Sequence, residues 1–167
     1  MNLKTKFILV ILSVTFFSKI SFAETGPWTL SFGNFDFSDK GKNASLVEVD
    51  YGFKDKLFSS PIGDVKPVAG FFATEKSAVY GFTGVKIDYQ LFDNLLTITP
   101  SFTPGLYHKG DGKDLGHTVE FKSQVRAGFN FSKDSFIGAA YNHLSNASLG
   151  SKNPGANSYT INLQTRF

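Results

Sequence analysis

Hydrophobic and polar side chains alternate along most of the chain after residue 23. A period of two residues is typical of a β-strand with one apolar face and one polar face. We find no segment of useful length after residue 23 with the 3.6-residue period of an amphipathic helix. The pattern therefore predicts an all-β protein.

Eight strand-like runs follow one another, and turn-forming Gly, Pro, Asn, Asp or Ser residues separate them. The predicted strands are Trp28–Phe37, Ala44–Phe53, Val65–Ala73, Val79–Leu91, Leu95–His108, Gly116–Asn130, Phe136–Asn146 and Asn157–Phe167. Most of them reach the length of roughly 9–11 residues that a tilted strand needs to cross a membrane.

The polar faces of these strands carry balanced charge. They collect four acids and four bases, namely Glu48, Asp50, Lys86, Asp88, Glu120, Lys122, Arg126 and Arg166. Such a set suits the interior of a small closed barrel that is filled by ion pairs, while the apolar faces meet lipid. Only a closed barrel leaves no unpaired strand edge in hydrocarbon. We therefore expect an eight-stranded antiparallel transmembrane β-barrel of outer-membrane type, which is too narrow for an aqueous channel.

The first 23 residues have the features of a secretory signal peptide. Lys4 and Lys6 precede a short apolar run, and Ser21 and Ala23 provide small residues before a cleavage site. We expect residues 1–23 to be this leader and residues 24–167 to be the barrel. The leader holds three of the 17 Lys and Arg residues, so the remaining chain has 14 basic against 14 acidic residues and gives no argument for nucleic-acid binding.

Composition is consistent with a membrane barrel. Aromatic residues make up 16% of the chain, a high content for a small soluble domain, and the last residue is Phe167, a terminal aromatic typical of outer-membrane barrels. The chain has no Cys, which excludes disulfides and thiolate metal sites. A soluble β-sandwich also alternates, and it is the less favoured alternative.

A polar group interrupts the apolar face of the seventh predicted strand. His143 and Ser145 share the face of Ile137 and Tyr141, and Asn157 has the matching parity in the last strand. A base beside a hydroxyl is the minimum for an activated nucleophile. With both termini in the periplasm, this group lies near the outer leaflet. The alternative is a band of polar residues at the level of the lipid headgroups.

The residues around this group resemble a known family. The run His143-Leu144-Ser145-Asn146-Ala147, then Asn153-Pro154-Gly155, and upstream Leu115–Phe121, are similar to PagL-type lipid A 3-O-deacylases of the outer membrane. The resemblance implies lipid A as substrate, Ser145 as nucleophile and His143 as general base. It also implies that Asn146 and Asn153 are candidates for stabilising the oxyanion.

One residue departs from the family pattern. Ungapped counting places Asn157 where well-known members carry a Glu that orients the His. An Asn can accept a hydrogen bond from the imidazole, although it cannot stabilise the imidazolium by charge. Glu120 is a poor substitute because its parity points it into the lumen.

The sequence thus predicts a carboxylic ester hydrolase in the outer membrane of a Gram-negative bacterium, with lipopolysaccharide as its partner and with no metal or cofactor. Both a monomer and a homodimer are compatible with it. Two alternatives remain: a structural or adhesion-type barrel without catalysis, and a deacylase homologue that Asn157 has made inactive.

Overall fold

The computed structural model describes residues 26–39, 41–133 and 135–166. The predicted signal peptide and Phe167 lie outside the described residues. Ten strand segments occur, namely β1 (Trp28–Phe35), β2 (Ala44–Gly52), β3 (Phe58–Ser60), β4 (Gly63–Thr74), β5 (Val79–Ile87), β6 (Tyr89–Leu91), β7 (Leu96–His108), β8 (Val119–Asn130), β9 (Ser135–Ser145) and β10 (Ala156–Thr165). Within these ranges, no helix is long and apolar enough to span a membrane.

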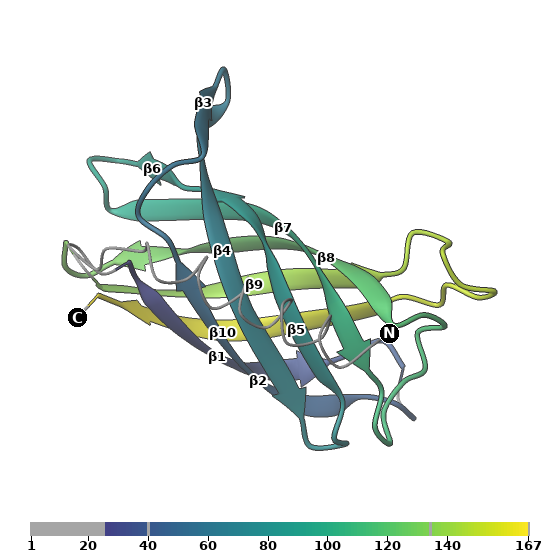
Figure 1. Ribbon diagram of the computed structural model, residues 1–167. Helices are drawn as coiled ribbons and strands as arrows, with labels where there is room; N and C mark the ends of the chain where they lie inside the picture. The colour runs from purple at the N-terminus through teal and green to yellow at the C-terminus, as the bar shows by residue number, and fades with distance from the viewer. Residues whose placement is uncertain (1–25, 40, 134, 167) are drawn as a thin grey trace, which may run out of the picture.

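The strands form one closed antiparallel barrel (Figure 1). The β1 strand pairs with both β2 and β10, and the pairing of β2 with β4 completes the circle. Because β5 and β6 keep a single register against β7, they form one strand that is interrupted at Asp88. The barrel therefore has eight strands, which confirms the predicted fold.

The short β3 is the one segment that the sequence pattern did not predict. It pairs with the beginning of β4 and forms a hairpin that projects away from the barrel wall (Figure 1). The sequence indicated only a turn here, because three strand residues beside Pro61 and Gly63 are too few to show a period.

The two ends of the barrel differ in their connections. We call the end where β1 begins and β10 ends the termini end, and the other end the loop end. Connections at the termini end include residues 92–95 and 131–134, and those at the loop end include residues 36–43, 109–118 and 146–155. The His143 and Asn157 side chains belong to the loop end.

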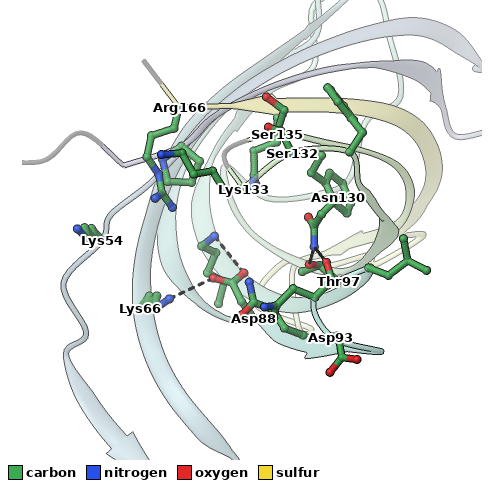
Figure 2. A pocket seen from close by; sticks show the side chains of 18 of the residues that line it. Lys54, Lys66, Asp88, Asp93, Thr97, Asn130, Ser132, Lys133, Ser135 and Arg166 are labelled. Atoms are coloured by element: carbon green, nitrogen blue, oxygen red, sulfur yellow. Dashed lines mark hydrogen bonds and ion pairs between the residues drawn. The ribbon is translucent and has the colours of Figure 1, made fainter.

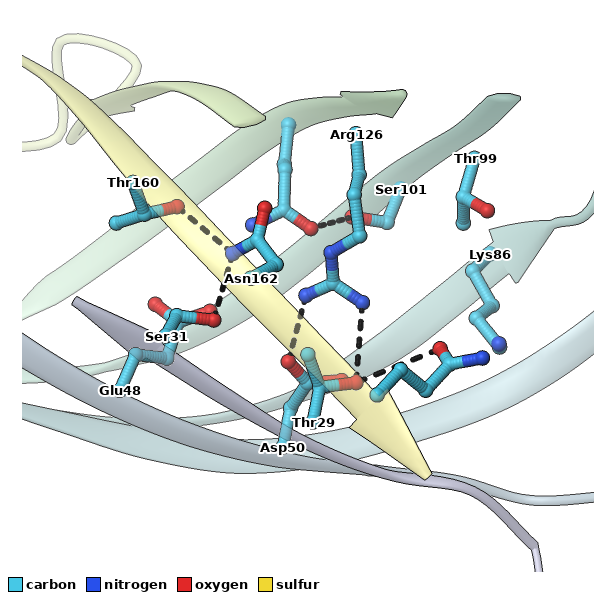
Figure 3. Close-up of polar contacts among 12 residues, drawn as sticks. Thr29, Ser31, Glu48, Asp50, Lys86, Thr99, Ser101, Arg126, Thr160 and Asn162 are labelled. Atoms are coloured by element: carbon cyan, nitrogen blue, oxygen red, sulfur yellow. Dashed lines mark hydrogen bonds and ion pairs between the residues drawn. The ribbon is translucent and has the colours of Figure 1, made fainter. Parts of the chain in front are cut away.

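Ion pairs and hydrogen bonds fill the middle of the lumen (Figure 3). Lys122 Nζ lies 2.7 Å from Glu48 Oε2, and Arg126 Nη2 lies 2.6 Å from Asp50 Oδ2. Six of the eight predicted lumen charges are buried, namely Glu48, Asp50, Lys86, Glu120, Lys122 and Arg126. The predicted polar interior is thus confirmed. Ion pairs offset the cost of removing five of these charges from water, whereas neither carboxylate oxygen of Glu120 has a hydrogen-bond partner among the described residues.

Phe136 also points into this polar lumen, as its parity predicts, and is 2% exposed. Its ring lies over Gly128 and Gly138, which are opposite each other on β8 and β9. A Cβ atom at either glycine would come within 2.7 Å of Phe136 Cζ. The two glycines therefore provide the space that lets a large aromatic ring fit inside a narrow barrel.

The loop end of the lumen is apolar. A buried cluster closes it, formed by Phe35, Leu46, Phe72, Ala78, Tyr80, Phe82, Tyr107, Leu115, Leu144 and Ala156. The termini end is instead hollow, with a cavity of about 570 Å³ (Figure 2). Asp88 lies in its wall and pairs with both Lys66 and Lys86, while Arg166 lies at its rim.

Candidate active site

Three of the predicted site residues, His143, Ser145 and Asn157, lie on the outer face of β9 and β10. His143 and Asn157 are directly opposite each other in the antiparallel register. Asn142 and Leu144, on either side of His143, are buried in the lumen, whereas His143 and Ser145 are partly exposed. Strand alternation therefore separates the outward polar group from the buried network only one residue away.

The Asn157 side-chain oxygen accepts two hydrogen bonds. His143 Nδ1 lies 2.8 Å from Asn157 Oδ1, and the Tyr141 hydroxyl donates to the same oxygen at 2.8 Å. Since a carbonyl oxygen only accepts, His143 Nδ1 carries the proton in this contact. That tautomer leaves Nε2 of the imidazole with a free lone pair, which is the form a general base needs.

Ser145 completes the outward group without a fixed partner. Among the described residues, its hydroxyl makes no hydrogen bond, and it lies two residues beyond His143 on the same face. Gly155 has a φ of +61°, and a Cβ there would approach His143 Cε1 to 3.1 Å. Glycine at 155 thus accommodates both the left-handed backbone and the imidazole ring.

The loop of residues 146–155 is held by asparagine side chains. The Asn146 backbone N–H, next to Ser145, donates to Asn153 Oδ1 at 3.1 Å. The Asn146 side chain is fully buried, and its amide donates to the carbonyls of Leu115 and Lys152 and accepts from Ser148 N. The structure therefore brings Asn153 beside Ser145, whereas the amide of Asn146 is occupied inside the loop.

A charged contact ties this loop to its neighbour. Asp114, in the loop of residues 109–118, accepts a hydrogen bond from Lys152 Nζ at 3.0 Å and another from Gly116 N at 2.9 Å. These bonds lower the pKa of the Asp114 carboxyl from its ordinary value, chiefly through Lys152. The contact fixes the residue adjacent to Asn153.

Other titratable residues lie away from the outward group. Glu120 is fully buried in the lumen, so it cannot replace the missing carboxylate at His143. The His117 ring accepts a hydrogen bond from Val119 N at 3.0 Å, a contact within its own turn. Within the described part of the chain, no group of three or more His, Cys, Asp or Glu residues is arranged to hold a metal ion.

Tyr141 is the contact that the sequence analysis missed. The alternation predicts only that Tyr141 faces lipid. Tyr141 also lies two residues from His143 and diagonally across from Asn157. The signal was therefore present in the strand register. What the sequence could not provide was the side-chain conformation that brings the Tyr141 hydroxyl to within 2.8 Å of Asn157 Oδ1.

Comparison with known proteins agrees with the barrel fold. Among solved structures, the barrel is similar to the crystal structure of the outer membrane enzyme PagL, with a TM-score of 0.66 and 16% identity over 84% of this chain and 99% of that one. It is also similar to a de novo designed transmembrane β-barrel, with a TM-score of 0.52 and 8% identity over 86% of this chain and 98% of that one. Both likenesses support the fold.

No curated protein matches the chain. A family model, that of lipid A 3-O-deacylase (PagL), matches residues 47–166, which include all of the outward polar group. The family and the barrel indicate an outer-membrane location. The chain belongs to the lipid A 3-O-deacylase (PagL) family.

Proposed function

We propose that the protein hydrolyses the acyl ester at the 3-position of lipid A in the outer leaflet. The observation that carries the proposal is the 2.8 Å contact between His143 Nδ1 and Asn157 Oδ1, with Ser145 on the same outward face. Membership of the deacylase family supplies the substrate. A substrate held in the membrane also agrees with a polar group that opens toward lipid rather than toward the lumen.

In this proposal Ser145 Oγ attacks the ester carbonyl while His143 Nε2 takes its proton. The tetrahedral intermediate collapses, the imidazolium returns the proton to the sugar oxygen, and an acyl-Ser145 ester remains. A water molecule then attacks that ester with the same base, which releases the fatty acid and restores Ser145. Asn157 keeps His143 in the required tautomer through a neutral hydrogen bond.

The oxyanion has two candidate side chains, and Asn153 is the stronger one. Its Oδ1 accepts from Asn146 N, the amide that follows Ser145, and its NH2 group makes no hydrogen bond within the described residues, so it is available to donate. Asn146 supports the site through its buried loop contacts. Residues 1–23 are proposed to direct export to the membrane where the substrate lies.

The test is mass spectrometry of lipid A from cells that express the parent, Ser145→Ala or Ser123→Ala. Ser123 is a matched control because it is an exposed outward serine opposite His143 on β8. We expect loss of the 3-linked acyl chain with the parent and with Ser123→Ala. Ser145→Ala should reduce deacylation at least a thousandfold, since nucleophile and base act as a unit.

An inactive homologue is the second candidate, and Asn157 is the observation that favours it. Its prediction is distinct: lipid A would be unchanged by the parent, while Asn157→Glu would create deacylation. Equal deacylation by the parent and by Ser145→Ala would remove Ser145 as nucleophile.

A further inference from the structure

Asn157 Oδ1 accepts hydrogen bonds from two side chains of the same strand, although the bond from His143 alone would be enough to orient the imidazole. The Tyr141 hydroxyl and His143 Nδ1 each lie 2.8 Å from it. We propose that Tyr141 is a positioning residue that keeps the Asn157 amide turned with its oxygen toward His143. The inference rests on the proposed function, because it assigns Tyr141 a role in maintaining the general base.

An amide needs this control because its two ends are chemically different. With Oδ1 toward the ring, His143 Nδ1 carries the proton and Nε2 is free to accept the proton of Ser145. Rotation of the amide by half a turn would aim its NH2 group at Nδ1, and the proton would then move to Nε2. That tautomer cannot act as a base toward Ser145. A carboxylate at position 157 would present an acceptor in either orientation.

The surroundings of Tyr141 favour the working orientation. Among the described residues, its hydroxyl has no hydrogen-bond partner other than Asn157 Oδ1. If the amide rotated, the Tyr141 hydroxyl would face the amide NH2 group instead of its oxygen, and loss of this donated bond costs free energy. Retaining this one donated bond therefore keeps Oδ1 in place.

Packing holds the tyrosine ring itself. The Phe37 ring meets Tyr141 edge-on, with centroids 6.4 Å apart, and contacts Tyr159 at 5.4 Å. The backbone N–H of Phe37 also donates to the Asn157 carbonyl at 3.0 Å. Phe37 therefore contacts both the ring of Tyr141 and the backbone of Asn157, and these contacts restrain the distance between the two hydrogen-bonded residues.

The experiment is a double-mutant cycle on initial rates of ester release in detergent micelles. Tyr141→Phe should lower kcat about threefold to tenfold with KM unchanged, as expected for one lost hydrogen bond. In the Asn157→Glu background the same change should have no effect, because a carboxylate needs no orientation. Tyr159→Phe is the matched control, since Tyr159 lies opposite Tyr141 with similar exposure. We expect it to keep the parent rate.

A second readout does not depend on activity. Nitrogen-15 spectra of His143, in a variant with the other two histidines replaced by Gln, report the ring tautomer directly. We expect Nδ1–H in the parent and a mixture with Nε2–H in Tyr141→Phe. An unchanged tautomer, or an equal loss of rate in both backgrounds, would overturn the positioning role. Inactivity of the parent with the expected tautomers would count against the proposed function and leave the positioning intact.

Discussion

The lumen and the outer face of the same two strands use polar residues in opposite ways. Inside the barrel, Lys122 of β8 and Asn142 of β9 have partners at 2.7 and 2.6 Å and are almost inaccessible to water. Outside, Ser145 of β9 has no partner within the described residues, and His143 has a lone pair free. The polar groups inside are committed to structure, and those outside retain the capacity to react.

The comparison shows how one strand supports two functions. Because side chains alternate, replacing an inward residue should change the stability of the barrel, whereas replacing the next outward residue should change the chemistry. Substitutions on the two faces should therefore separate a loss of stability from a loss of rate.

The largest effect is expected inside the lumen, at Lys122. Lys122→Met leaves the Glu48 carboxylate buried without its partner at 2.7 Å, and breaking such a pair costs about 3–5 kcal/mol. Urea titration followed by the gel shift between folded and unfolded barrel measures the loss. The rate per folded molecule should stay the same. The paired replacement Lys122→Met with Glu48→Gln should recover most of the stability, and equal midpoints for parent and single variant would contradict the separation.

The intermediate effect is expected outside, at Asn157. Asn157→Ala should lower the rate about 10- to 100-fold, because a hydrogen bond to the charged imidazolium contributes roughly 1.5–3 kcal/mol. Asn157→Glu should keep or raise the rate through charge stabilisation of the imidazolium. Initial rates of acyl release from the three proteins provide the measurement, with the urea midpoint expected to be unchanged. A parent-like rate in Asn157→Ala would remove Asn157 as the orienting residue.

The smallest effect is expected at the loop contact between Asp114 and Lys152. Asp114→Asn should change the rate by less than about threefold at moderate salt, since exposed ion pairs contribute little. Because the folded pKa of Asp114 is lowered, its contribution is present above about pH 4 and is lost as pH falls through the lowered pKa. Backbone relaxation of Lys152 and Asn153 between pH 6 and 3 should show increasing motion in the parent. If the backbone motion of Lys152 and Asn153 stayed the same from pH 6 to pH 3, the contact would not contribute to ordering this loop.

Much of the fold could be predicted from the sequence because lipid imposes a strict alternation. The inward positions of Glu48, Lys122 and Arg126 follow from parity alone, and so does the outward group of His143 and Ser145. The β3 hairpin could not be predicted, since three residues show no period. The hydrogen bonds of the Asn146 side-chain amide could not be predicted either, because they depend on loops that only the closed barrel brings together. The reactive roles of His143, Ser145 and Asn157 stay predictions.

The hollow termini end has a consequence for the permeability of the membrane. Its cavity of about 570 Å³ ends at the ion-paired middle of the lumen. Beyond these ion pairs, a layer of rings in which Phe35, Phe72 and Tyr80 are at most 2% exposed closes the loop end. Water and ions that enter the cavity therefore meet first the ion-paired middle of the lumen and then the apolar layer, and they have no open route to the loop end. The protein should conduct no ions in a planar bilayer, so a cell can raise the number of copies without adding a leak for small solutes.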